Sequence, residues 1–432
     1  MRGRLNVFQS AMLRWRENAP YNAVHAAQLP GRLDAAQLER AIAAHLEAIG
    51  VTGLRLDAQK RRFEYAGGPA SVSLAVIPGG DDPERALDEE MGRHFNTPFP
   101  REGAFEPFRF FAIDASDRFY MGIAYDHFVA GGDSIVALLK GIVHRYAGKA
   151  CVDVAVPDLY PPSYARLFLR NFGHFYVGQF SVPAMIARAR RALRPRYPYG
   201  DTSENAFTSV RLSPPECAAL VRTARAWGVT LNDLMLASLL TALGPEVGAR
   251  NPRERRHEIA IASVINLRRE LVPDRTPVFG QFLSSFLVSH PLPPGIRLET
   301  LAQDIHRQTR RLKRRKLYLQ TLCLIALGGV TWRYMTAEQR KHVHAKNYPV
   351  WAGMTMLNIN AIWSEAPGDA PVPPYLRSGS TGPFAPLLVA PTSCGDEMRI
   401  GLSYRTSAFR REDVARIGDA LVACARSLQG PG

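Results

Sequence analysis

Residues 119–125 are the feature that most constrains the fold, because they form an uncharged, mostly apolar run. A strand that is apolar on both faces must lie in the interior of a sheet, with other elements packed on both sides. Residues 105–113, with aromatic side chains at positions 105, 108, 110 and 111, predict a neighbouring strand. A helix is predicted at 134–146. Together these elements predict an α/β fold built on a sheet.

The same kind of pattern begins again in the second half of the chain. At about 100–200 residues per domain, 432 residues suggest two domains or one two-lobed unit. Thr230 is a plausible N-cap for a helix through residue 243, because its hydroxyl can accept a free amide at the helix start. Other predicted helices are 33–46, 83–95 with Asp82 as cap, 214–227, 298–315 and 411–428; other predicted strands lie within 51–66 and at 207–212, 259–265, 282–290, 350–362, 387–390 and 398–404.

We therefore predict two similar α/β lobes of mixed sheet and helices. The N-terminal lobe is expected at 1–175, a mixed aromatic and basic bridge at 176–206, and the C-terminal lobe at 207–432. The hydrophobic fraction of 46% supplies enough apolar material for two cores, which excludes global disorder.

The net charge limits the kinds of partner that the protein can be expected to bind, and the cysteine content limits the cellular compartments that we expect. The net charge of +15 favours acidic partners such as phosphates, anionic lipid or an acidic protein. Nucleic acid is the weakest of these, because no recognised binding motif accompanies the charge. The cysteines are far apart, without zinc spacing, so we expect no metal and no disulfide framework. With no continuous apolar signal segment, and with the longest apolar run (317–332) shorter than the roughly 20 residues of a spanning helix, we predict a cytoplasmic protein.

The segment from Tyr125 to Ser134 is the candidate site. An interior strand ends at Asp126 and His127, and Gly131, Gly132, Asp133 and Ser134 lead into the next helix. A histidine at a strand end is held rigidly, and its ring can project into a cleft between lobes. With an ordinary pKa of about 6.5, it can take a proton from an amine or hydroxyl.

Each of these residues also has a purely structural interpretation. His127 could be a hydrogen-bonded packing residue. Asp126 is predicted to be a loop or ion-pair residue before it is a catalyst, and Asp133 and Ser134 to be helix caps.

These residues resemble a known family. Asp126 to Gly132 is similar to the His-His-x-x-x-Asp-Gly signature of condensation-domain and chloramphenicol-acetyltransferase-like acyltransferases, with His127 on the second His. Further likeness extends in order through nearly the whole chain, at residues 20–34, 229–235, 266–268, 279–282 and 401–409. The resemblance implies a V-shaped pair of lobes with His127, the general base, in a tunnel between them. It places Asn358 and Asn360 in a strand that lines the tunnel.

Two positions depart from the signature. Asp126 replaces its first His, and Gly131 replaces its Asp, which in the family pairs with a second-lobe arginine that corresponds to Arg268. Either Asp133 takes over that pairing, or Arg268 is left to meet an anionic substrate.

The activity that the resemblance implies is acyl transfer from a phosphopantetheine thioester, on coenzyme A or an acyl carrier protein, to a small amine or alcohol. The thioester is a cosubstrate, and no bound cofactor is expected. One rival is a binding or scaffold protein that has lost turnover, motivated by Asp126 and Gly131. Another is a membrane-surface lipid O-acyltransferase.

A basic run, formed by Arg307, Arg310, Arg311, Lys313, Arg314, Arg315 and Lys316, bears on the choice of partner. A solvated helix face is its default interpretation. It could instead dock an acidic carrier or the phosphates of coenzyme A, or let the apolar stretch after it contact an anionic bilayer.

Overall fold

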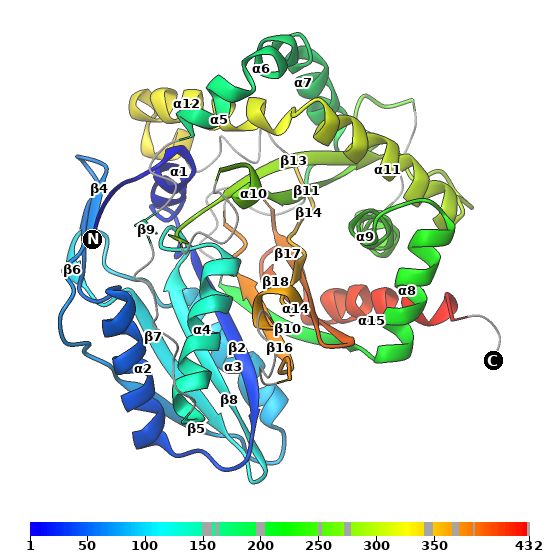
Figure 1. The fold of residues 1–432 in the computed structure, drawn as a ribbon. Helices are drawn as coiled ribbons and strands as arrows, with labels where there is room; N and C mark the ends of the chain where they lie inside the picture. The colour runs from blue at the N-terminus through cyan, green and yellow to red at the C-terminus, as the bar shows by residue number, and fades with distance from the viewer. Residues whose placement is uncertain are drawn as a thin grey trace.

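The computed structural model describes residues 1–148, 158–159, 164–195, 204–248, 253–271, 278–340, 349–364, 371–382 and 385–429. Two α/β lobes make up the chain, one built mainly from the N-terminal half and one from the C-terminal half (Figure 1). This arrangement confirms the predicted fold class.

The sheet of the first lobe has the strand order β16-β2-β8-β7-β5. β8 (Arg118–Asp126) lies between β2 (Asn22–Pro30) and β7 (Phe108–Asp114), antiparallel to both. The apolar run 119–125 is therefore an interior strand, as predicted. β5 (Leu74–Pro78) extends the sheet parallel to β7.

Helices cover both faces of this sheet, which explains why β8 is apolar on both sides. α2 (Ala35–Ile49) and α4 (Gly132–Tyr146) pack on one face, and α3 (Pro83–Asn96) on the other (Figure 1). The Asp82 side chain caps α3, as predicted, by accepting the Arg85 amide at 3.0 Å.

A smaller sheet, of order β1-β4-β3-β6, lies beside α1 (Val7–Trp15); its strands are β1 (Arg2–Arg4), β3 (Leu54–Asp57), β4 (Arg62–Tyr65) and β6 (Gly103–Phe105).

The sheet of the second lobe has the order β10-β18-β17-β14-β11-β13, with β15 also paired to β17. Its strands are β10 (Asn205–Leu212), β11 (Ile259–Asn266), β13 (Leu283–His290), β14 (Ala352–Met354), β15 (Leu357–Asn358), β17 (Leu387–Cys394) and β18 (Glu397–Arg405). Helices α8 (Pro214–Ala226), α9 (Leu231–Val247), α11 (Leu298–Arg314) and α15 (Arg411–Ser427) pack together on it. Thr230 caps α9 as predicted, accepting the Asp233 amide at 3.2 Å.

One strand crosses between the lobes. β16 (Tyr375–Gly379) comes from the C-terminal half but pairs antiparallel with β2 of the first sheet. The segment predicted as the C-terminal lobe, 207–432, is therefore not confined to that lobe. The other predicted boundaries stay predictions.

The remaining helices gather at one end of the molecule. α5 (Ala165–Arg170), α6 (Phe172–Gln179), α7 (Val182–Arg191), α12 (Tyr318–Thr331) and η1 (Trp332–Tyr334) lie there together (Figure 1). Gln320 joins two of them, because its Nε2 donates to the Phe175 carbonyl at 2.9 Å. The short elements β9 (Asp158–Leu159), α10 (Arg268–Leu271), β12 (Val278–Phe279) and α14 (Asn360–Trp363) complete the described chain.

The segment 350–362 differs from its prediction. Residues 350–362, predicted as strand, form β14, β15 and the short helix α14 instead, because the chain turns after each short pairing. Within the described ranges, no single helix has the length and apolar composition to cross a membrane. Within those ranges, α8 and α9 have the required length and apolar composition only when they are taken together, and the two helices are bent by 106° relative to each other.

Candidate functional site

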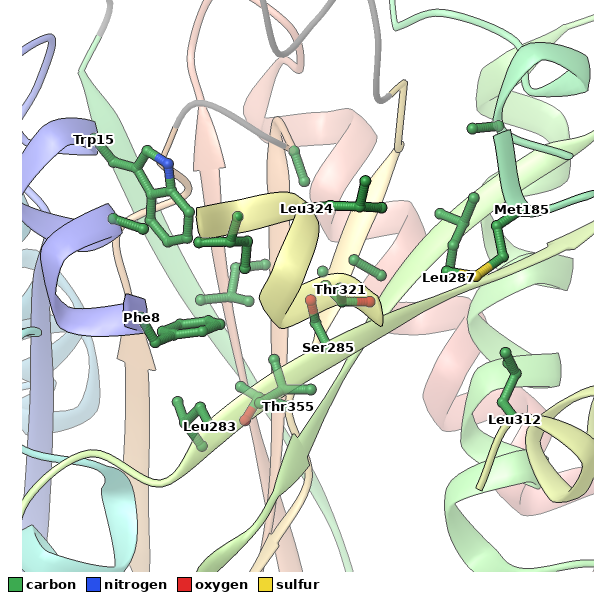
Figure 2. Close-up of a pocket in the computed structure, with 18 of the residues that line it drawn as sticks. Phe8, Trp15, Met185, Leu283, Ser285, Leu287, Leu312, Thr321, Leu324 and Thr355 are labelled. Atoms are coloured by element: carbon green, nitrogen blue, oxygen red, sulfur yellow. The ribbon is translucent and has the colours of Figure 1, made fainter. Parts of the chain in front are cut away.

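A cavity of about 1570 Å³ lies where the two lobes meet. Phe8 and Trp15 of α1 line one side of it, Met185 of α7 and Leu287 of β13 line the other, and Thr321 of α12 lies between them (Figure 2). Leu283, Ser285 and Leu287 alternate along β13, so the cavity follows this strand. At about 3.3 Å per residue, the stretch from Leu283 to His290 spans roughly 23 Å.

His127 is one of the residues that line this cavity. It follows the last residue of β8, and its amide donates to the Tyr21 carbonyl at 2.9 Å. Gln281, from the second lobe, holds the loop from the other side: its Nε2 donates to the His127 carbonyl at 2.6 Å and to the Ala130 carbonyl at 3.0 Å. The histidine therefore lies at the junction of the lobes, with its backbone fixed by both.

The surroundings of His127 keep its imidazole neutral. Burial lowers its pKa from 6.5 to about 4, and the nearby positive charge of Arg377 acts in the same direction. A hydrogen bond with the backbone of Ala130 opposes these effects only in part. A neutral imidazole at pH 7 can accept a proton, which is the state that a general base requires.

Asp126, which stands at the signature's first His, forms a buried ion pair with Arg16. The guanidinium of Arg16 also donates to the Arg101 carbonyl at 2.6 Å, and it lies over the Phe128 ring. Burial nevertheless raises the pKa of the Asp126 carboxyl. The ion-pair interpretation of Asp126 is confirmed: the pair ties the histidine loop to the end of α1.

The predicted capping role of Asp133 and Ser134 is wrong. α4 begins at Gly132, and its N-cap is Gly131, a glycine without a side chain that could cap the helix. The Gly131 amide donates to the Gly280 carbonyl at 2.9 Å. Asp133 and Ser134 therefore lie inside the first turn. Ser134 Oγ contacts the backbone of Gly280 at 3.3 Å, and the Asp133 carboxylate accepts a hydrogen bond from Asn266 at the cavity wall.

The second-lobe arginine expected to pair with this loop has other partners. The Arg268 guanidinium lies 5.1 Å from the Phe282 ring centroid, and its Nη1 donates to the Val278 carbonyl at 3.4 Å. Asp133 does not take over the lost pairing, since its described partner is Asn266. Arg268 is also absent from the described cavity wall, so it is not placed to meet a substrate there.

Asn358 and Asn360 do not belong to the described cavity wall, although Leu357 beside them does. Asn358 is exposed, and its Oδ1 accepts the Asn360 amide at 3.0 Å. The Asn360 side chain bonds both backbone groups of Gly395 at 2.8 Å. The predicted tunnel role of both residues is corrected to a turn-stabilising one.

Three residues around His127 were not predicted as site residues: His25 and Arg377, which line the cavity, and Gln281, which binds the histidine loop. His25 of β2 is buried, with Nδ1 2.8 Å from the Tyr375 hydroxyl and Nε2 3.3 Å from the Tyr125 hydroxyl, and burial lowers its pKa well below the ordinary value. A histidine inside an apolar strand is a signal that could have identified it. Gln281 and Arg377 are placed by contacts between lobes, and no local pattern marks them.

The cavity end beyond His290 is strongly cationic. Arginines of α7, α11 and two loops line it: Arg188, Arg190, Arg194, Arg255, Arg256, Arg307, Arg311 and Arg315. All six arginines and lysines from Arg307 to Arg315 are exposed, and Arg307, Arg311 and Arg315 also line the cavity mouth. Lys316, the last residue of the run, is half-buried and pairs with Glu270 at 2.6 Å. Its default interpretation, a solvated face, is therefore confirmed for all of the run except Lys316, and three of its arginines also border the cavity.

The fold is that of condensation domains. The chain superposes with a TM-score of 0.70 over all of its length and 85% of the EpoB NRPS cyclization-docking bidomain from Sorangium cellulosum, at 14% identity. The first condensation domain of the calcium-dependent antibiotic synthetase, in complex with a substrate analogue, matches with a TM-score of 0.65 at 17% identity, covering 100% of this chain and 97% of that one.

SgcC5 from Streptomyces globisporus covers 99% of both chains, with a TM-score of 0.66 and 15% identity. No protein-family model and no curated protein matches the sequence. At these identities the comparisons establish the condensation-domain fold of the chain.

Proposed function

We propose that the protein is an acyltransferase that moves an acyl group from a pantetheine thioester to an amine or hydroxyl, with His127 as the general base. One observation carries this proposal: a neutral imidazole lines a long cavity at the junction of two lobes. The condensation-domain fold supports the same class of reaction.

The proposed chemistry needs only positioning and one proton acceptor. His127 takes the proton of the acceptor amine or hydroxyl as its lone pair adds to the thioester carbonyl carbon. The tetrahedral intermediate then collapses, the carbon–sulfur bond breaks, and the protonated imidazole returns the proton to the departing thiolate. Because the thioester is already activated, no covalent enzyme intermediate is required.

The cationic end of the cavity supports a phosphate-bearing donor. Arg188, Arg307 and Arg311 line it, and clustered arginines bind and steer phosphate groups. A pantetheine arm anchored there by its phosphate would extend along β13 toward His127. Coenzyme A and an acyl carrier protein both present such an arm, and the proposal includes either. No resident metal or cofactor is part of it.

The proposal is tested by acyl transfer with a panel of acyl thioesters and acceptors, followed by mass spectrometry. His127→Ala should lower the rate at least about 10²-fold, the usual contribution of a general base. His257→Ala, which removes a histidine outside the described cavity wall, is the matched control. An unchanged rate in His127→Ala would remove the catalytic role. Binding without turnover by the wild-type protein would favour the scaffold alternative.

An exposed apolar patch favours a second proposal, that the protein works at a membrane surface. We define the apolar patch as the exposed side chains on α5, α6, α12 and η1: Leu169, Phe172, Tyr176, Val177, Phe180, Leu324, Leu327, Val330 and Tyr334. Phe180 is 75% exposed and Leu327 is 61% exposed. Patches of this kind on a soluble surface mark interaction sites.

Charge around the apolar patch points to an anionic bilayer. The sequence contains no Asp or Glu between Asp158 and Asp201, or between Asp304 and Glu338, and these two acid-free segments supply the patch. Arg166, Arg170 and Arg333 are exposed on the same elements. Val177, Phe180 and Leu324 also line the cavity, so an acyl chain could pass from lipid to cavity along apolar surface. The cytoplasmic location stays a prediction from the sequence.

A further inference from the structure

Arg377 is a buried cation that lines the cavity. It lies on β16, directly opposite His25 of β2, and only 6% of its surface is exposed. β16 is the strand that the C-terminal half adds to the first sheet, so this crossing places a guanidinium beside the histidine site. Its charge is close enough to lower the pKa of both His25 and His127.

Protein groups accept only part of the hydrogen bonds that the Arg377 guanidinium can donate. Nη2 donates to the carbonyls of Thr355, at 2.7 Å, and Pro391, at 3.4 Å. Nε is buried and has no hydrogen-bond partner in the described part of the chain. A buried donor without a partner costs free energy, so it calls for an explanation.

The other buried arginines provide an internal comparison. Within the described ranges, three arginines are buried: Arg16, Arg377 and Arg399. Arg16 pairs with Asp126, and Arg399 pairs with Glu84 and Glu397. Among the residues that the structure describes, no carboxylate pairs with Arg377. Among the described residues, the two buried arginines away from the cavity therefore have ion-pair partners, and the one at the cavity does not.

Within the described ranges, no nearby titratable group forms an ion pair with Arg377. The pKa values of Tyr125 and Tyr375 are raised by burial, so both phenols stay neutral. His25 and His127 are neutral as well. Asp133 lines the same cavity, and its charge partly offsets the lowering of the Arg377 pKa by burial, but its carboxylate accepts a hydrogen bond from Asn266 and forms no described ion pair with the guanidinium.

We propose that Arg377 binds a free carboxylate of the acyl acceptor, and that the acceptor class is therefore small amino or hydroxy acids with an apolar body. A carboxylate matches the planar guanidinium donors and supplies the ion-pair partner that the described protein groups do not. Arg377 lies opposite His25, and the Tyr125 ring lies 5.8 Å from the His25 ring and 6.1 Å from the His127 ring. Because Arg377 and His127 are this close, the carboxylate and the acylated amine or hydroxyl belong to one small molecule. This inference rests on the proposed acyl transfer and specifies its acceptor.

The test compares acids with their neutral amides. The probes are 3-phenyllactate with 3-phenyllactamide, leucine with leucinamide, and octanoate with octanamide. Binding is followed by isothermal titration calorimetry, and acyl transfer is measured for the pairs that carry a nucleophile. The wild-type protein should bind at least one acid about 10- to 100-fold more tightly than its amide, the range of a hydrogen bond to a charged group.

Two variants of Arg377 separate binding from a structural role. Arg377→Met should abolish the preference for the acid, so that the ratio of KM for the amide to KM for the acid falls to about one, while Arg377→Lys should retain part of the preference. Arg211→Met, an exposed arginine of β10 outside the described cavity wall, is the control and should leave the ratio unchanged.

Equal binding of acid and amide by the wild-type protein across all pairs overturns the proposal, and so does a preference that survives in Arg377→Met. If the wild-type protein transfers acyl groups equally well to acid and amide, the acceptor assignment fails and the acyltransferase function stands. If His127→Ala keeps full activity, the catalytic proposal itself fails.

Discussion

Gln281 Nε2 donates a hydrogen bond of 2.6 Å to the His127 carbonyl, and this contact joins the second lobe to the histidine loop of the first. The same amide nitrogen reaches Ala130 at 3.0 Å. In the family signature an Asp at the position of Gly131 would pair with an arginine across this junction. Here a glutamine from the opposite lobe binds the loop through its backbone.

Replacing Gln281 should therefore impair catalysis more than folding. Gln281→Leu removes both bonds and leaves the loop free to shift, and a misplacement of about 1 Å can cost on the order of 10²-fold in rate. Acyl-transfer kinetics and thermal unfolding would be measured together. A loss of stability that accounts for the whole loss of rate would contradict the positioning role.

The signature's Asp can be restored at position 131, which tests the role of Gln281 from the other side of the contact. A Cβ at Gly131 would lie 3.2 Å from Gln281 Oε1 and 3.5 Å from the Gly280 carbonyl, so a carboxylate there meets two acceptors. Gly131→Asp should lower activity. Higher activity in this variant would show that Gln281 does not replace the missing pairing.

The pH dependence of activity should reflect the lowered pKa of His127. With a pKa of about 4, caused mainly by burial, the imidazole remains the active, neutral base down to about pH 5, where it is roughly 90% neutral. At the ordinary value of 6.5 only about 3% would be neutral at pH 5. We expect kcat/KM for a hydroxyl acceptor to fall only as the pH drops through about 4. An acidic limb near pH 6.5, with the fold intact by circular dichroism, would contradict this environment.

Asp88 links the lobes in a way that depends on pH. Its carboxylate accepts the Ser209 amide and hydroxyl, both at 3.0 Å, between α3 and β10, and burial raises its pKa from 3.8 to about 7. An acid with a raised pKa binds its proton more tightly in the folded state. Its contribution to stability is therefore full below about pH 4 and is lost as the pH rises toward 7.

Asp88→Asn keeps an oxygen that can accept the Ser209 amide but removes the ionisation. The variant should gain stability relative to the wild-type protein between pH 4 and pH 8, as measured by urea unfolding. Asp117→Asn, at a side chain that is 76% exposed, is the control for the loss of one negative charge. If the difference in stability between Asp88→Asn and the wild-type protein does not change with pH, the raised pKa of Asp88 does not contribute to stability and the prediction is wrong.

Membrane contact through the apolar patch is tested by co-sedimentation with vesicles. The wild-type protein should bind vesicles of phosphatidylcholine with phosphatidylglycerol, and should bind less as salt is raised, because screening weakens the basic contribution. Phe172→Ser combined with Leu327→Ser should lower binding about tenfold or more, since both side chains are exposed in the patch.

Val76→Ser is the matched control, because Val76 is an exposed apolar residue of β5 in the first sheet. No binding by the wild-type protein, or equal losses in the control and patch variants, would exclude the membrane role. Size-exclusion chromatography tests the alternative. If the wild-type protein is a dimer, the patch variant is a monomer, and neither protein binds vesicles, the patch is an interface between copies of the chain.

The sequence alone determined the local structure and the position of the histidine. The apolar run that forms β8, the caps at Asp82 and Thr230, and the placement of His127 at a strand end all depend on neighbouring residues and their periodicity. The predicted start of the helix after His127 was wrong by two residues, since α4 begins at Gly132. Its N-cap, Gly131, is held by the carbonyl of Gly280, a contact with a distant segment that no local pattern contains.

Tertiary structure decided which groups surround the histidine. Arg377 reaches the cavity only because β16 pairs with β2, and Gln281 reaches the loop only because the lobes meet there. These contacts join residues more than a hundred positions apart, and their geometry depends on which sheet edges come together. A sequence pattern has a range of a few residues, so it cannot specify them.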